Sequence, residues 1–162
     1  MDLPSHFIWA FVLFHSQPWA WVAVVFCCVP DFLWFFPRLV KVARHRLVNR
    51  RESVQFTDIN DTRTRHLYRT NHSLITAGFA SLLAFLVSTP GMAIGVFAGW
   101  ALHLFMDIWT HKGGIVDGIR LFYPLSDWKF PALIWWKEEL QRRPWIYGLN
   151  LAAAAAVFVL LG

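Results

Sequence analysis

The sequence predicts an all-helical, polytopic integral membrane protein with about four transmembrane helices and one interfacial helical segment. Its residues are 57% hydrophobic and include ten Trp and fifteen Phe, more than a soluble domain of 162 residues can bury. Several apolar stretches approach the roughly 20 residues that a helix needs to cross a bilayer. All 15 Lys and Arg fall in two blocks, residues 38–69 and 112–143, as expected for loops on one side of a membrane. The length suits one domain, residues 1–162.

The first apolar stretch, residues 7–29, is long enough to span a bilayer, but the sequence HSQP at 15–18 interrupts it. It forms either one kinked span or two short helices folded into a hairpin, and the sequence is compatible with both. Cys27 and Cys28 lack the spacing of a disulfide framework or a metal site, so we expect small core residues. The polar stretch 38–71 is expected to be a solvated basic loop with some helix.

The rest of the chain predicts three further membrane helices. Residues 73–88 and 91–110 form two apolar helices, separated by the sequence TPG at 89–91, which favours a tight turn. Residues 111–144 return to polar and aromatic sequence and form the second basic loop, whose Trp-rich part is typical of a segment lying in the membrane interface. Residues 146–162 form a last, rather short span.

The two basic blocks predict the topology. Loops rich in Lys and Arg stay on the cytoplasmic side, so the simplest arrangement in the inner (cytoplasmic) membrane has four spans, both blocks inside and both termini outside. Positive charge at that face favours membrane lipids with anionic headgroups, and we expect no nucleic-acid partner. This topology brings Asp31, His72 and Asp107 to the same cytoplasmic face.

Two predicted helices each carry a ladder of small residues, four apart, that leads to ionisable residues. Positions 91, 95, 99, 103, 107 and 111 read Gly, Gly, Gly, His, Asp, His, and positions 72, 76, 80, 84 and 88 read His, Thr, Ala, Ala, Ser. Small residues let membrane helices approach closely, so we expect the two ladders to face each other, with His72 opposite Asp107.

One small site can then hold His72, His103, Asp107 and His111, with Asp31 joining from the first apolar stretch. Imidazole and carboxylate ligands suit a divalent metal; zinc is the first expectation, manganese and iron(II) are alternatives, and the site takes one ion or two. Side chains four apart share a helix face, which spaces a His and an Asp well for ligation. The alternative is a hydrogen-bonded cluster that locks the helices together without a metal.

The role of His6 depends on the first apolar stretch. If residues 7–29 form one span, His6 lies on the far side of the membrane. If HSQP is a hairpin turn, His6 returns beside Asp31 and is a further metal ligand.

Several motifs together carry a resemblance to a known family. The sequences PD at 30–31, NHSL at 71–74, HLFMDIWTHKGG at 103–114 and FYPLSDWKF at 122–130 resemble the bacterial and archaeal membrane-bound metal-dependent hydrolases. This small inner-membrane group includes a LexA-regulated member and is distantly similar to zinc-dependent phospholipase C. The resemblance covers scattered motifs within residues 5–130. It implies metal ligands at His6, Asp31, His72, His103 and Asp107, and Thr110 and His111 continue the last motif.

The chain departs from the family pattern at two places. Where the family has HRGxTHS, this chain reads LYRTNHS at 67–73. The second acid of the family's PDxD motif is also absent, because residue 33 is Leu.

The residues and the resemblance together predict a metal-dependent hydrolase at the cytoplasmic face, cleaving a phosphoester of a lipid or lipid-linked substrate. A metal-activated water is the expected nucleophile, and Asp31 or His111 is the expected proton acceptor. Lys112, Arg120 or Arg69 is expected to hold the anionic phosphate. Two non-enzymatic alternatives remain: a metal or proton transporter with His and Asp as relay groups, and a structural protein whose cluster only fixes helix packing.

Overall fold

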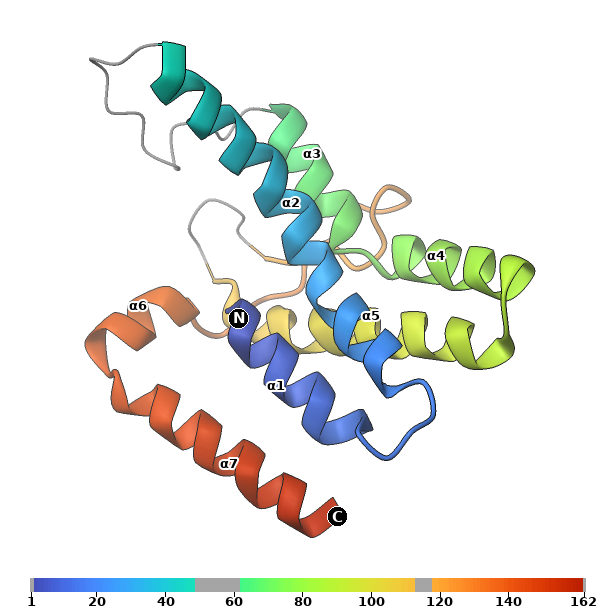
Figure 1. Ribbon diagram of the computed structural model, residues 1–162. Helices are drawn as coiled ribbons and strands as arrows, with labels where there is room; N and C mark the ends of the chain where they lie inside the picture. Colours follow the sequence, from blue (N-terminus) through green and yellow to red (C-terminus); the bar gives the residue numbers. More distant parts are fainter. Residues whose placement is uncertain (1, 49–61, 113–117, 162) are drawn as a thin grey trace.

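The computed structural model describes residues 2–48, 62–112 and 118–161, and this part of the chain is all-helical, without a strand. The predicted fold class is therefore confirmed. The helices are α1 (Leu3–Phe14), α2 (Ala20–Val48), α3 (Thr62–Asn71), α4 (Leu74–Val87), α5 (Pro90–Thr110), α6 (Trp136–Arg142) and α7 (Trp145–Leu161). As Figure 1 shows, α4 and α5 lie side by side, and the long α2 crosses α5 before it continues along α3.

A tight turn at residues 15–19 joins α1 to α2, so the first apolar stretch is a hairpin. The His15 N–H donates to the Phe11 carbonyl at 2.8 Å where α1 ends. With 12 residues, α1 is only about 18 Å long, too short to cross a hydrocarbon core of about 30 Å. The alternative of one kinked span is therefore wrong, and His6 returns to within 3.9 Å of Asp31.

The second helix continues far beyond the predicted first span. It runs through Pro30 and Pro37 to Val48, and α3 forms the end of the stretch 38–71 that we expected to be a loop with some helix. That stretch is thus helical at both ends, and residues 49–61 lie outside the described residues.

The glycine face of α5 packs against α2, and not against α4 as the sequence predicted. A Cβ atom at Gly99 would lie 2.1 Å from the Ala23 carbonyl oxygen, and one at Gly95 would lie 2.9 Å from a side chain of α2. The matching small residues belong to α2, where Ala23 and Cys27 are fully buried. The row on α2 leads to Asp31, four residues after Cys27, so close packing of these two helices brings the ionisable ends of both rows together.

The helices α4 and α5 pair through the predicted turn at TPG. The Thr89 hydroxyl accepts the Met92 N–H at 3.3 Å at the start of α5. One helical turn after Thr89, the Ala93 carbonyl of α5 accepts a hydrogen bond from the Ser81 hydroxyl of α4 at 2.8 Å. At its other end α4 meets α3 at a bend of 60°, and His72 lies at this bend.

An irregular segment, residues 118–135, supports the bend between α3 and α4. The Leu74 N–H donates to the Leu121 carbonyl at 2.8 Å, and the Ser73 hydroxyl donates to the Tyr123 carbonyl at 2.6 Å. The predicted interfacial segment is therefore helical only in α6, and the part before it ties α4 to the end of α5.

Two helical stretches are long and apolar enough to cross a membrane, Ala20–Arg44 within α2 and the whole of α5. The bent pairs α3 with α4 and α6 with α7 raise the number to four if each pair counts as one span. Apolar side chains are widely exposed on these helices, for example Leu86 and Val159, which are 68% and 78% exposed. Such surfaces are expected where helices face lipid.

The hairpin changes the predicted position of the amino terminus. Both termini were expected opposite the basic blocks, but the amino end of α1 lies with the end of α5, where Asp2 and Arg143 line one cavity. The carboxyl end of α7 does lie at the other end of the bundle, where the Phe158 ring is 4.8 Å from the His15 ring.

Substitution of Gly99 tests the close contact between α2 and α5. We expect Gly99→Ala to lower the free energy of unfolding by about 1–3 kcal/mol, because the new methyl group overlaps the Ala23 backbone. The matched control is Gly78→Ala on α4, where an added Cβ meets nothing within 4 Å. Thermal unfolding in detergent is the measurement, and equal melting temperatures for the two variants would contradict this packing.

Candidate metal centre

The last turns of α5 supply the centre of the site. His103 and Asp107 stand four residues apart on one face of the helix and are both 0% exposed, and the His103 Nε2 lies 3.3 Å from the Asp107 Oδ2. His111 follows one turn later, with its Nδ1 3.5 Å from the Asp107 Oδ1. The predicted helix face is confirmed for these three residues.

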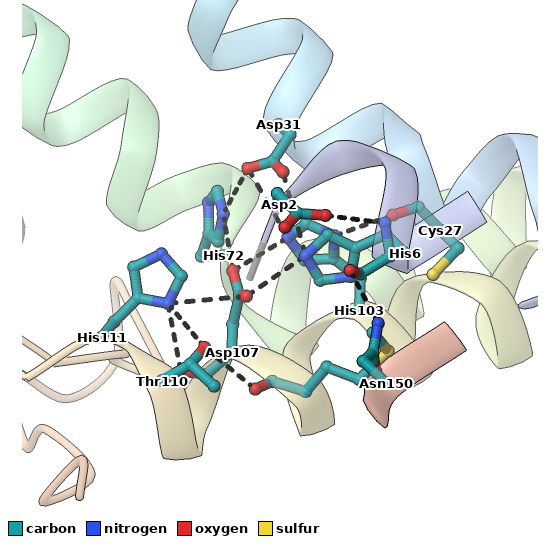
Figure 2. A network of polar contacts seen from close by, with 12 residues as sticks. Asp2, His6, Cys27, Asp31, His72, His103, Asp107, Thr110, His111 and Asn150 are labelled. Atoms are coloured by element: carbon teal, nitrogen blue, oxygen red, sulfur yellow. Dashed lines mark hydrogen bonds and ion pairs between the residues drawn. The ribbon is translucent and has the colours of Figure 1, made fainter. Parts of the chain in front are cut away.

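Three other elements bring the remaining predicted residues to Asp107 (Figure 2). α1 contributes His6, whose Nε2 is 3.2 Å from the Asp107 Oδ1. The bend between α3 and α4 contributes His72, whose Nε2 is 3.5 Å from the Asp107 Oδ2, so these two residues are opposite each other as predicted. Asp31 enters from the middle of α2, with its Oδ1 3.5 Å from the His72 Nε2. All five residues predicted as metal ligands therefore meet at one place.

In each of the two carboxylates, one oxygen atom faces His72 and His103 and the other faces His6. His72 and His103 face the Asp107 Oδ2 at 3.5 and 3.3 Å and the Asp31 Oδ1 at 3.5 and 3.9 Å. His6 faces the other two oxygens, the Asp107 Oδ1 at 3.2 Å and the Asp31 Oδ2 at 3.9 Å. Each carboxylate thus lies between His6 on one side and the pair His72 and His103 on the other.

Backbone hydrogen bonds fix two of the imidazoles with one nitrogen turned to the carboxylates. The Nδ1–H of His72 donates to the Tyr68 carbonyl at 3.0 Å, and the Nδ1–H of His103 donates to the Cys27 carbonyl at 2.7 Å. A neutral imidazole that donates from Nδ1 keeps a lone pair on Nε2, the state that binds metals. Neither Nε2 has a hydrogen-bond partner among the described residues.

The distances in the cluster are compatible with a bound metal ion. Nitrogen and oxygen ligands lie about 2.0–2.2 Å from zinc, so adjacent ligand atoms in a tetrahedral site are roughly 3.3–3.6 Å apart. One ligand atom from each of Asp31, His72, His103 and Asp107 lies within 4.8 Å of the other three. Charge-assisted hydrogen bonds between imidazole and carboxylate would be shorter, about 2.7–2.9 Å.

His111 lies at the edge of the cluster and makes different contacts. Its Nδ1 is 3.2 Å from the Asp107 carbonyl oxygen, and its ring meets the Trp135 ring at 5.8 Å. Burial lowers the pKa of His111 to about 4, although the negative charge of Asp107 opposes this shift. His111 is therefore neutral at physiological pH and contacts Asp107 from the edge of the cluster.

Two neighbours of the site were not predicted from the sequence. The Tyr68 ring stacks on the His72 ring at 3.8 Å, the residue is 3% exposed, and its hydroxyl has no hydrogen-bond partner among the described residues. The Cys27 thiol lies within 4.8 Å of a nitrogen of His6 and of His103. Each stands four residues before a predicted ligand, Tyr68 before His72 and Cys27 before Asp31, and this helical spacing was the available signal.

The predicted phosphate-binding cations are less well supported by their contacts. The Arg120 Nε lies 3.5 Å from the Asp127 Oδ1, so this guanidinium already has an anionic partner. Lys112 directly follows His111 and is exposed. Arg69 is only half-buried, on α3.

The rim of the site is formed by Asp31 and His111. The Asp31 side chain is 20% exposed and that of His111 is 8% exposed, whereas the side chains of His6, His72 and Asp107 are fully buried. Asp31, and to a small extent His111, are therefore the side chains of the cluster that solvent contacts.

Comparison with known proteins adds nothing to this picture. No family model, no curated protein and no solved structure matches the chain.

Proposed function

We propose that this protein is a metal-dependent hydrolase at the cytoplasmic membrane surface that cleaves a phosphoester of a lipid or lipid-linked substrate. The observation that supports it best is the set of buried imidazole nitrogens: the Nε2 atoms of His6, His72 and His103 face two carboxylates at 3.2–3.9 Å without a hydrogen bond among the described residues. His72, His103, Asp107 and Asp31 would hold the ion, with zinc as the first candidate and manganese or iron(II) as alternatives.

A metal accounts for the cluster better than a helix clamp does. A buried polar atom without a hydrogen bond costs about 1–3 kcal/mol, so a cluster selected for stability alone would pair its imidazoles directly with the carboxylates. A divalent cation would neutralise the two negative charges of the carboxylates. It would also be coordinated by the unused lone pairs of the imidazole nitrogens. The resemblance of the motifs to membrane-bound metal-dependent hydrolases points to the same chemistry.

Each residue of the site then has a defined task. A bound divalent metal supplies a Lewis acid and lowers the pKa of its water to about 7. Asp31, at the exposed rim, takes the proton of the attacking water. His111 orients Asp107 through the contact at 3.5 Å. The Tyr68 hydroxyl donates a hydrogen bond to the negative charge that develops on the substrate.

The surroundings of the rim favour a substrate from the membrane. Directly after Asp31, α2 exposes Phe32 and Phe36, which are 55% and 51% exposed and stack on each other at 5.6 Å. Exposed aromatic side chains of this kind suit the membrane interface, and the cations Lys41 and Arg44 follow on the same helix. A phosphoester at headgroup depth would thus lie next to the open side of the site.

Metal content is the first test of this proposal. We expect purified protein to carry metal at one equivalent or more, and His103→Ala and Asp107→Asn to lose most of it, because both remove a buried ligand. Mass spectrometry of the metal in detergent-purified protein is the measurement. His15→Ala is the matched control, since His15 bonds to the Val12 carbonyl at the other end of α1. Absence of metal after reloading with zinc or manganese would leave only the helix clamp.

Hydrolysis is tested separately from metal binding. We expect the metal-loaded protein to release phosphate or a phosphorylated headgroup from a panel of phospholipids and soluble phosphodiesters in liposomes. A chelator should abolish this release and zinc or manganese should restore it, whereas Asp107→Asn should stay at background. A fully metal-loaded protein that cleaves nothing in the panel would contradict the hydrolase and leave a metal-binding membrane protein.

Tyr68→Phe tests the proposed hydrogen bond to the reacting group. We expect kcat to fall by about 100-fold with little change in KM, because the donor acts on charge that develops in the transition state. Tyr123→Phe is the matched control, since the Tyr123 hydroxyl contacts His66 away from the cluster. Unchanged kcat, or a loss of metal in Tyr68→Phe, would assign the tyrosine to packing on His72 instead.

A further inference from the structure

The contacts of the carboxylate oxygens define two sides of the site, one at His72 and His103 and a second at His6. The Asp107 Oδ2 and the Asp31 Oδ1 face His72 and His103. The Asp107 Oδ1 and the Asp31 Oδ2 face His6, at 3.2 and 3.9 Å from its Nε2. A single ion held by His72 and His103 would therefore contact one oxygen of each carboxylate and would not use the His6 imidazole.

The geometry points to a second divalent metal ion held by His6 Nε2, Asp107 Oδ1 and Asp31 Oδ2, with both carboxylates bridging it to the first ion. This inference rests on the metal centre of the proposed function and extends it from one ion to two.

The surroundings of His6 support this position. The side chain is 0% exposed, and neither of its ring nitrogens has a hydrogen-bond partner among the described residues. A buried imidazole with no hydrogen bond on either nitrogen is costly, and a cation at Nε2 would remove part of that cost. The hairpin places His6 here, so the short α1 gains a function that a membrane span would not have.

The stacking of His6 on His103 supports two adjacent ions. The ring centroids are 4.0 Å apart and the planes are inclined by 24°. Each ring turns its Nε2 to a different oxygen of Asp107, at 3.2 Å for His6 and 3.3 Å for His103. Two ions bound at these nitrogens would be neighbours on the two oxygens of one carboxylate, as in two-metal hydrolytic sites.

Charge gives the second ion a chemical role. Asp31 and Asp107 together carry two negative charges, which one divalent ion neutralises. A second divalent ion leaves the site positive, which favours a phosphoester anion and a bound hydroxide. With three protein ligands on its side, the second ion would keep positions open for both.

Cys27 offers a competing arrangement. Its thiol lies within 4.8 Å of a nitrogen of His6 and of His103, so a single ion on these three residues would use His6 without bridging carboxylates. The bridged arrangement is favoured, because the His103 Nδ1–H donates to the Cys27 carbonyl and its Nε2 faces the carboxylates.

The test counts bound ions. Detergent-purified full-length protein is stripped with a chelator, reloaded with zinc or with manganese, and analysed by mass spectrometry of the metal. We expect two ions per chain for the unchanged protein and for His15→Ala, and one ion for His6→Asn. Electron paramagnetic resonance of the manganese form needs no variant: a coupled pair of ions gives an exchange-coupled spectrum, and an isolated ion gives a simple hyperfine spectrum.

The outcomes separate this inference from the proposed function. One ion in the unchanged protein, with a simple manganese spectrum, overturns the second site and leaves the single-metal hydrolase intact. No ion at all overturns both. Loss of an ion in Cys27→Ser, together with a thiolate-to-metal charge-transfer band in the cobalt-loaded protein, assigns His6 to the competing thiolate site. Two ions, an exchange-coupled spectrum and loss of one ion only in His6→Asn establish the bridged pair.

Discussion

The buried carboxylate of Asp107 is the constraint on which the rest of the structure depends. It lies on α5, one of the two helical stretches long and apolar enough to cross a membrane, and it is 0% exposed. An isolated charge in such a place is very costly. Four imidazoles from three parts of the chain lie 3.2–3.5 Å from its oxygens. The helices can therefore be understood as the supports that bring these imidazoles to one point.

The packing of α2 on α5 is what brings the second carboxylate to the first. Because Gly99 has no side chain, the backbone of α2 at Ala23 approaches α5 closely enough to exclude even a methyl group. The approach lets the Cys27 carbonyl accept the His103 Nδ1–H at 2.7 Å, and Asp31 follows one turn later. A glycine on α5 thus helps to fix the orientation of the His103 imidazole one turn away, and the cluster and the helix packing share the same contacts.

Much of the candidate site could be predicted from the sequence, because its residues stand at helical spacing. Residues 103, 107 and 111 share one face of any α-helix, and the turn at TPG returns His72 to the same end. The partner of the glycine row could not be predicted, because small residues permit close approach without specifying which helix approaches. The role of His6 could not be decided either: HSQP suits a kink and a turn equally, and the hairpin depends on contacts with distant segments such as Asn150, which bonds to Ser5 and Trp9.

The position of the rim links this chemistry to the membrane. Asp31 is the most exposed carboxylate of the cluster, and the next residues of α2 expose aromatic side chains before the basic residues begin. On an amphipathic sequence of this kind, apolar side chains lie at the acyl boundary and cations at the headgroups. The proposed function requires the site to open at the depth of the lipid phosphates. A substrate phosphoester could reach the metal by moving along the membrane surface, without transfer of its acyl chains into water, which would cost about 0.8 kcal/mol for each CH₂ group. A transporter would instead require a path through the membrane on both sides of the cluster.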